Sequence, residues 1–253
     1  MNSWIGEFSI AVGLLGLLFV AFWTGRRLGR ADDSDQTHLG VIQGASLGIL
    51  GLLIGFSFSG AMGRFGDRRE VLVREANAVS TAWMRTDLLP PDARGRLRGE
   101  MVEYARARLS LFEAAETDVG ERAEAAVAVV QDRLWRDACV CVGESESLRQ
   151  MILPPLNEAF DLRSERNAAA RSHIPGAVVA ALILSAILST AMISYGQSRR
   201  RAPVLFPAVG LVLLIGTVIW ITIDLDFPRS GLVQVSDQPL RELLTQMTTP
   251  GPG

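Results

Sequence analysis

The chain has 253 residues, of which 49% are hydrophobic and 21% charged, and its formal net charge is −2 at pH 7. This length allows one large domain or two small ones. The near-neutral balance lacks the basic excess by which nucleic-acid-binding proteins attract phosphates, so we expect no nucleic-acid partner.

Charged residues are strongly segregated along the chain, because four runs contain none of them. These runs have 18, 25, 25 and 22 residues and are Phe8–Gly25, Leu39–Gly63, Ile174–Ser198 and Ala202–Ile223. A helix needs about 20 apolar residues to cross a bilayer, whereas buried helices of soluble proteins are usually shorter and rarely apolar on every side. The pattern predicts a multi-pass membrane protein whose first partner is the lipid bilayer.

The four runs divide the chain into segments that alternate between membrane and water. We expect a membrane hairpin of helices 1 and 2 over residues 1–63, an extramembrane helical region over 64–173, a second hairpin of helices 3 and 4 over 174–223, and a C-terminal tail over 224–253. The middle region carries most of the charge, and its apolar residues recur at helical spacing, as in Leu72, Ala76, Val79 and Trp83. No alternating strand pattern competes, so the predicted fold class is all-α.

Three positions predict helix breaks within the middle region. Pro90-Pro91-Asp92 ends one helix, with Asp92 placed to cap the next. Gly120 predicts a second break. Pro154-Pro155 predicts a third, inside a segment whose apolar residues include Met151 and Ile152. By contrast, nothing between Leu39 and Leu89 prevents one long helix of roughly 75 Å at 1.5 Å per residue. Such a helix would leave the lipid near Gly63 and continue into water.

Signals for enzyme chemistry are weak. His38 and His173 have no second ligand at metal-binding spacing. Cys139 and Cys141 could bind a metal or form a redox pair, but two residues at this spacing point to different faces of a helix. We expect both cysteines to be buried, to pack as small hydrophobic side chains and to lie in a reducing compartment. We therefore expect no catalytic residue, no metal and no cofactor.

The ionisable and small residues of the spans indicate which kind of transport the protein could support. Glu7, Asp224 and Asp226 lie at span boundaries. Solvation at the interface is the role we favour for Glu7, and for Asp224 and Asp226 it is only the simplest alternative. No charged residue lies in mid-membrane. Ion-coupled transporters usually need such a residue. This leaves a pore lined by small, hydroxyl and aromatic side chains. Glycines at helical spacing let membrane helices approach closely, which is the simplest role for Gly44, Gly48, Gly51 and Gly55.

Three separated stretches resemble a family. They are GFSFSGAMGRFGDRREVLVREANAVSTAWMRTDLLP, PPLNEAFDLRSERNAAARSHIP and LDFPRSGLVQVSDQPLREL. Together they resemble the bestrophin-like family of bacterial membrane proteins, and the likeness extends roughly from Gly40 to Leu244. That family is distantly similar to bestrophins, which are homopentameric anion channels with four membrane helices and a helical cytosolic layer. The resemblance implies the same fold, an oligomer and inorganic ions as partners.

The likeness to bestrophins implies roles for single residues. Gly55-Phe56 and Arg64-Phe65 match the spacing in the bestrophin second helix, so Phe56 takes the place of the innermost aromatic residue that gates the pore. Leu52 and Gly48 stand one and two turns earlier, where bestrophins have large apolar residues, and Gly48 departs from that pattern. With Ser59 on the same stripe, the hypothetical pore lining is Gly48, Leu52, Phe56 and Ser59.

Two further motifs follow from the same likeness. The membrane-boundary motif comprises Arg64, Phe65, Asp67 and Arg68, and the C-terminal motif comprises Asp224, Asp226, Pro228 and Gly231. The bestrophin turn after helix 4 is matched in composition, but here Phe227 precedes Pro228. The dense acidic run of the animal calcium clasp is missing, so calcium gating does not carry over.

The location of the charges gives no single orientation. Six Arg lie in the two short loops, at positions 26, 27, 30 and 199–201, and seven lie near the opposite ends of helices 2 and 3. Short loops weigh more in the positive-inside rule, which places the middle region outside, whereas the family likeness places it in the cytoplasm. We adopt the cytoplasmic orientation in a bacterial inner membrane. The functional expectation is an oligomeric anion channel lined by helix 2, and the alternative is a non-conducting membrane scaffold or sensor.

Overall fold

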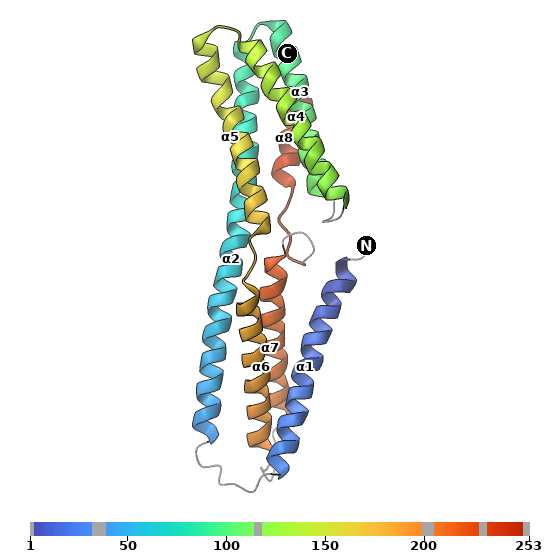
Figure 1. Ribbon diagram of the computed structural model, residues 1–253, viewed down its shortest axis with the longest axis vertical. Helices are drawn as coiled ribbons and strands as arrows, with labels where there is room; N and C mark the ends of the chain where they lie inside the picture. The colour runs from blue at the N-terminus through green and yellow to red at the C-terminus, as the bar shows by residue number, and fades with distance from the viewer. Residues whose placement is uncertain (1–2, 32–38, 114–117, 199–204, 228–231, 250–253) are drawn as a thin grey trace. The chain divides into compact units, whose positions relative to one another are not determined.

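The computed structural model describes residues 3–31, 39–113, 118–198, 205–227 and 232–249, and every regular element in these ranges is a helix (Figure 1). The predicted all-α fold is confirmed. The α-helices are α1 (Ser3–Ala31), α2 (Leu39–Arg85), α3 (Pro91–Glu113), α4 (Asp118–Val142), α5 (Glu146–Arg171), α6 (Gly176–Gln197), α7 (Leu205–Asp226) and α8 (Gln238–Thr248), and a 3-10 turn, Thr86–Leu88, follows α2.

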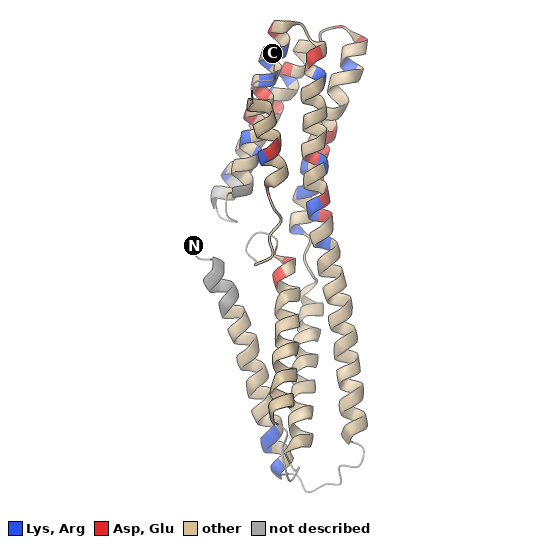
Figure 2. Cartoon of the chain, turned by 180° about the vertical axis from the view of Figure 1, so that it is seen from behind, with Lys and Arg blue, Asp and Glu red and all other residues tan. Residues whose placement is uncertain are grey.

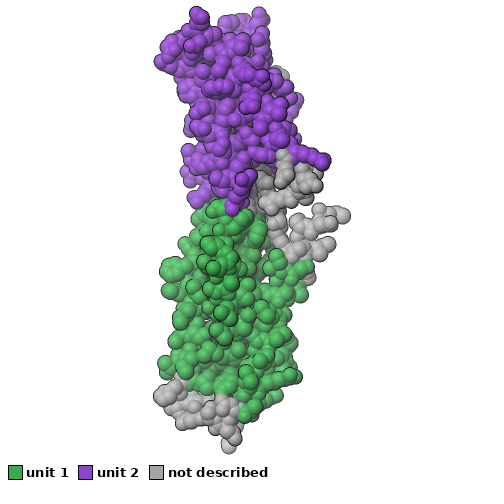
Figure 3. All heavy atoms as spheres, in the orientation of Figure 1, with its two compact units in different colours: residues 1–65, 172–234 green, residues 66–171, 235–253 purple. Residues whose placement is uncertain are grey.

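The chain forms two compact units (Figure 3). The membrane unit comprises residues 1–65 and 172–234, and the polar unit comprises residues 66–171 and 235–253. Within the described residues, four helices are long and apolar enough to cross a membrane. The four spans expected from the charge-free runs are therefore confirmed by length and composition.

The membrane unit is built from α1, the first part of α2, α6 and α7. Its core includes Leu18 from α1, Leu50 from α2, Ala186 from α6 and Ile219 from α7, each no more than 1% exposed. Lipid tails are as apolar as these side chains, so the hydrophobic effect does not drive membrane helices together. Van der Waals packing and hydrogen bonds between the helices hold the unit together instead.

α1 and α6 approach each other closely in this unit. A Cβ atom at Gly25 would lie 2.1 Å from the Ala191 carbonyl oxygen, so only glycine fits there. One turn further, a Cβ at Gly29 would lie 2.3 Å from Ser198 Oγ. The Ser194 hydroxyl donates a hydrogen bond of 2.5 Å to the Phe22 carbonyl across the same contact. The two glycines thus let two helix backbones meet at a distance where a hydroxyl bridges them.

Two polar contacts join α2 to α6 within the membrane unit. The hydroxyls of Ser46 and Ser189 are 2.7 Å apart, and Gln43 Nε2 donates to the Met192 carbonyl over 2.5 Å. The Gln43 amide also occupies the space beside Gly196, where a Cβ would lie 2.2 Å from its nitrogen. Hydrogen bonds of this kind between membrane helices contribute on the order of 1 kcal/mol each.

α2 is continuous through the change from apolar to charged sequence. Its 47 residues run without a break from Leu39 to Arg85, which confirms the predicted long helix. Figure 2 shows the first part of α2 free of charged residues and the second part rich in them. A helix satisfies its backbone hydrogen bonds internally, so the same backbone is suited to lipid and to water, and only the side chains change.

The polar unit has a buried ion pair within its apolar core. Arg108 of α3 donates from Nε and Nη2 to the two carboxylate oxygens of Glu75 on α2, over 2.5 and 2.8 Å, and both side chains are fully buried. Arg166 Nη1 of α5 lies 3.7 Å from the same carboxylate. Burial lowers the pKa of the Arg108 guanidinium, but the charge and hydrogen bonds of Glu75 outweigh it and raise that pKa above its ordinary value. The Arg108 guanidinium therefore stays charged, and its contact with Glu75 joins α2 to α3.

The expected break at Pro154-Pro155 is wrong, because α5 continues through both prolines. A proline has no N–H, so Pro155 leaves the Met151 carbonyl without its helical donor. Arg85 Nη1 donates to that carbonyl over 2.7 Å and replaces the missing bond. The apolar spacing of this segment predicts that Met151 and Ile152 are both buried. Ile152 is buried, but Met151 is 50% exposed.

Two other expected helix ends also differ from the structure. α3 begins at Pro91, so Asp92 lies within the first turn rather than at the cap. Proline is suited to a first helical position because the N–H that it lacks has no partner there. Gly120 lies inside α4, which begins at Asp118. Finally, the expected tail contains α8, whose Leu240, Leu243 and Met247 are buried in the polar unit.

Candidate pore-lining face and its boundary cluster

The hypothetical pore-lining residues lie on one open face of α2. Leu52 is 62% exposed and Phe56 is 70% exposed, and Gly48 and Ser59 are exposed on the same stripe. The spacings of four, four and three residues keep them within one side of the helix. The structure thus leaves this stripe uncovered by the chain's own helices, and a pore-lining role stays a prediction.

The opposite side of α2 is the side that packs within the membrane unit. Leu50 is 1% exposed, Ser57 is 7% exposed and Ala61 is fully buried. Only 6% of the most apolar window of this helix is buried in the single chain, against 28–33% for the other three candidate spans. The apolar half of α2 therefore offers far more uncovered surface than any other span.

The glycines of α2 make no close approach within the chain. A Cβ atom at Gly44, Gly48, Gly51 or Gly55 would meet no atom within 4 Å. The expected packing role is therefore wrong for contacts inside one chain. Contacts with a second chain stay a prediction. Close packing within the chain depends on glycines of other helices, among them Gly25 and Gly29 of α1.

Asp226, the last residue of α7, holds α2 at Arg64, near the boundary of the membrane unit. Arg64 Nε donates to Asp226 Oδ1 over 3.0 Å, and the backbone N–H of Ile174 donates to Oδ2 over 2.8 Å. His173 Nδ1 lies 3.1 Å from the Asp226 carbonyl and 3.4 Å from Oδ2, and its ring lies 5.2 Å from that of Phe227. Asp226 is only 3% exposed. One carboxylate therefore connects α2, α7 and the segment before α6.

Asp224 closes the turn that follows α7. Its carboxylate oxygens accept hydrogen bonds from the backbone N–H groups of Leu232 and Val233, over 2.9 and 3.1 Å, and the residue is 5% exposed. Both Asp224 and Asp226 are therefore bound within the protein, and the alternative of solvation at the interface does not apply to them. Pro228 and Gly231 of the same motif lie outside the described residues, as does the Glu7 side chain.

The other residues of the membrane-boundary motif have separate environments. Phe65 packs on a small cluster of Ala61, Ile174 and Leu225 in the membrane unit. Asp67 is exposed. Arg68 is 4% exposed and donates from Nε to the Ala169 carbonyl over 3.0 Å within the polar unit. The motif thus divides into structural contacts at Arg64, Phe65 and Arg68 and one solvated carboxylate.

The cysteines and histidine do not assemble a metal centre in the ranges that the structure covers, where no group of three potential ligands occurs. Cys139 is exposed, so the expectation of burial is wrong for it. The Cys141 thiol donates to the Ala93 carbonyl at 3.5 Å, and burial raises its pKa above the ordinary value. A raised pKa keeps the thiol protonated and poorly reactive.

Comparison with known proteins identifies the family. The model of the Bestrophin-like domain matches residues 12–240, which is most of the chain. The chain belongs to the Bestrophin-like family. A mutant bacterial Bestrophin homolog from Klebsiella pneumoniae has the same fold as this Bestrophin-like protein, with a TM-score of 0.70 and 15% identity over 94% of this chain and 99% of that one.

Two further structures share the fold of this Bestrophin-like protein. The Klebsiella pneumoniae homolog solved by Zn-SAD phasing has a TM-score of 0.64 and 14% identity, over 98% of this chain and 99% of that one. A crystal structure described as a membrane protein mutant has a TM-score of 0.66 and 13% identity, over 97% and 99% of the two chains. No curated protein matches the chain. The likeness therefore establishes a bestrophin fold in a membrane protein.

Sequence reasoning found Asp226 and Arg64 but missed their contact in this Bestrophin-like protein. It considered His173 only as a metal ligand and found no second ligand at a suitable spacing. In the structure, the His173 ring lies against the end of α7. A carboxylate just after an apolar span and an Arg just after another were the available signals. They show that both residues lie at a boundary, but residues 162 positions apart cannot be paired from one sequence.

Proposed function

We propose that this protein forms a homo-oligomeric channel for inorganic anions, with the exposed stripe of α2 around the pore axis. The family and the fold support a channel, and the open face of α2 supports this helix as the lining. The single observation that carries the proposal is the 70% exposure of Phe56 on an apolar face that its own chain leaves bare. Contiguous exposed apolar surface of this kind marks a contact with lipid or with other protein chains.

The position of Phe56 supports a gating role. If several α2 helices surround one axis, their Phe56 rings form a ring of apolar groups that narrows the pore. Hydrophobic constrictions stop ions by excluding water, so ion flow depends on how wide the ring opens. Leu52 one turn away would extend this neck, and Gly48 would leave it wider at the next turn.

The choice of anions is supported by the family analogy and by the lining. The charge-free run Leu39–Gly63 contains no carboxylate, so this part of the pore lacks the acidic rings by which cation channels attract their ions. Reversal potentials in a gradient of potassium chloride test this choice. An anion channel reverses near the chloride equilibrium potential, and reversal near the potassium potential would contradict the proposed selectivity.

Assembly is a necessary part of the proposal. Four membrane helices in one chain leave little room for an internal pore, so conduction requires several subunits around a symmetry axis, and five is the number in the bestrophin analogy. Light scattering of the purified protein in mild detergent measures this directly. A monodisperse monomer would contradict both the assembly and the channel.

The deciding experiment is electrical. Purified oligomers in a planar lipid bilayer should give currents. Repeated absence of current with intact oligomers present would favour a non-conducting membrane scaffold or sensor. We place the protein in a bacterial inner membrane with its polar unit in the cytoplasm, which the family analogy favours.

A further inference from the structure

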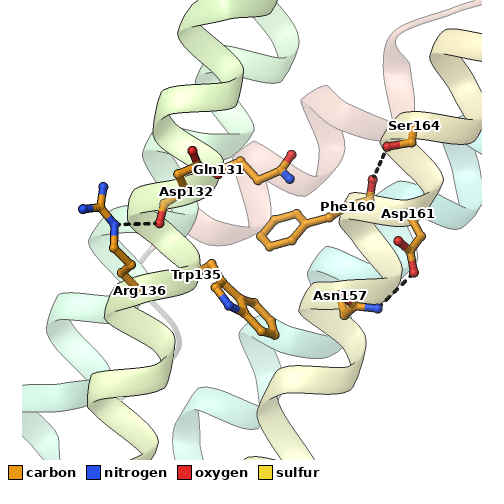
Figure 4. A pocket seen from close by; sticks show the side chains of 8 residues that line it. All are labelled: Gln131, Asp132, Trp135, Arg136, Asn157, Phe160, Asp161 and Ser164. Carbon is orange, nitrogen blue, oxygen red and sulfur yellow. Dashed lines mark hydrogen bonds between the residues drawn. The ribbon is translucent and has the colours of Figure 1, made fainter.

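The polar unit contains a cavity of about 660 Å³ between α4 and α5 (Figure 4). Two aromatic rings lie between the helices: Trp135 from α4 and Phe160 from α5, with ring centroids 6.1 Å apart and planes at 68°. Polar residues from both helices complete the lining, and these are Gln131, Asp132, Arg136, Asn157, Asp161 and Ser164. The cavity therefore combines an aromatic floor with a polar rim.

Two carboxylates of the rim have no cationic partner. Asp132 comes from α4 and Asp161 from α5, and within the described residues neither forms an ion pair. Asp161 Oδ2 accepts a hydrogen bond of 2.9 Å from Asn157 Nδ2, which fixes its position. The one cation of the lining, Arg136, donates from Nε to the backbone carbonyl of Asp132 over 3.2 Å. Figure 4 shows its guanidinium turned away from the two rings.

The chemistry of this lining is suited to a cation with an apolar body. The two carboxylates and one guanidinium give the lining a net charge of −1 (two negative, one positive), so an anion is disfavoured. Ammonium groups are attracted to aromatic faces, and methylene chains pack well on them. Each helix contributes one carboxylate to the lining, so a ligand with an ammonium group at each end of a methylene chain has one carboxylate for each end.

We propose that the cavity between α4 and α5 binds a linear aliphatic diamine or polyamine. The terminal ammonium groups contact Asp132 and Asp161, and the methylene chain lies against Trp135 and Phe160. The inference goes beyond the proposed function, because the cavity lies in the polar unit and its occupancy is measured without any ion current. A channel that fails to conduct would leave this site untouched, and an empty site would leave conduction untouched.

Titration calorimetry on the purified full-length protein tests the site, with putrescine and spermidine as the probes. We expect a dissociation constant on the order of 0.1–1 mM at low salt, from solvent-exposed ion pairs and cation–π contacts. Affinity should fall as salt is added, because exposed charges are screened. The neutral analogue 1,4-butanediol should give no saturable binding.

Matched variants separate this site from general attraction to an acidic surface. Asp132→Asn and Asp161→Asn should each weaken spermidine binding about fivefold, the value for about 1 kcal/mol, which is the upper range for an exposed ion pair. Asp137→Asn on α4 and Glu158→Gln on α5 remove carboxylates outside the cavity and should change affinity less than twofold. Absence of saturable binding, equal losses in all four variants, or equal binding of 1,4-butanediol would each overturn the proposal.

Discussion

Arg64 of α2 and Asp226 of α7 form an ion pair of 3.0 Å at the boundary of the membrane unit. Arg64 is 24% exposed and Asp226 is 5% exposed by side chain, so the pair is only partly screened by solvent. The same carboxylate accepts the Ile174 N–H, which leads directly into α6. The candidate pore helix is thus held, where it leaves the membrane unit, by the last residue of α7, which also binds the segment before α6.

Asp226→Asn should destabilise the membrane unit. Asparagine keeps the size of the side chain but loses the charge, and its amide nitrogen cannot accept one of the two hydrogen bonds. Hydrogen bonds to charged groups contribute about 1.5–3 kcal/mol, and we expect a loss of that size in thermal unfolding in detergent. Asp67→Asn, an exposed carboxylate on α2, is the control and should change stability by less than about 0.5 kcal/mol. Similar losses in both variants would show that Asp226 has no special role.

Gly25→Ala should disrupt the contact between α1 and α6. The new Cβ would lie 2.1 Å from the Ala191 carbonyl oxygen, so one backbone has to move. Overpacking of this kind costs typically about 1–3 kcal/mol. Gly13→Ala on the same helix is the control, since its Cβ would meet no atom within 4 Å, and alanine favours a helix. We expect a lower unfolding midpoint only for Gly25→Ala, and an unchanged midpoint would contradict the close helix approach.

Glu75→Gln should strongly destabilise the polar unit, because it leaves the Arg108 charge buried without a counter-charge. Breaking a buried pair from one side costs about 3–5 kcal/mol, which is measurable by thermal unfolding. The control is Glu165→Gln, which removes the exposed partner of Arg74 at 3.7 Å and should cost at most about 1 kcal/mol. The double variant with Glu75→Leu and Arg108→Met should recover part of the loss, because Arg166 still loses the carboxylate that lies 3.7 Å from it. A double variant no better than Glu75→Gln would contradict this account.

Much of the fold was predictable because membrane spans depend on local composition. A charge-free run of sufficient length can be predicted to span a membrane without knowing which helices it packs against. All four spans and the continuous α2 were therefore predicted from the sequence. The helix through Pro154 and Pro155 did not, because it depends on Arg85, a residue 66 positions away that donates to the Met151 carbonyl. α8 has only 11 residues and was missed, although Leu240, Leu243 and Met247 recur at helical spacing, because it lies in a short polar segment expected to form a tail.

The candidate site was predictable in part. Spacing alone placed Gly48, Leu52, Phe56 and Ser59 on one stripe, but only the packing of α2 shows that this stripe is the uncovered side. The contacts of Asp226 and the cavity beside Trp135 were outside the reach of one sequence. Each depends on residues of different helices that tertiary packing brings together.

Cys139 offers a direct test of the side on which the polar unit lies. The chain has only two cysteines, both on α4, and Cys139 is the exposed one. A membrane-impermeant maleimide added to intact cells should leave the protein unlabelled and should label it after permeabilisation, because the cytoplasmic orientation hides α4 from the outside. A Cys139→Ser variant controls for labelling at Cys141. Equal labelling before and after permeabilisation would reverse the orientation.

Phe56→Ala in planar bilayers tests the central claim most directly. Removing the rings widens the proposed constriction and lets water enter, so conductance or open probability should rise. Phe58→Ala is the matched control, because Phe58 lies about 200° around the helix from Phe56 and is 37% exposed against 70%. The account predicts larger currents for Phe56→Ala alone, with similar yields of intact oligomer for both variants. Equal currents and equal yields for the two variants would contradict the placement of α2 and Phe56 in a pore.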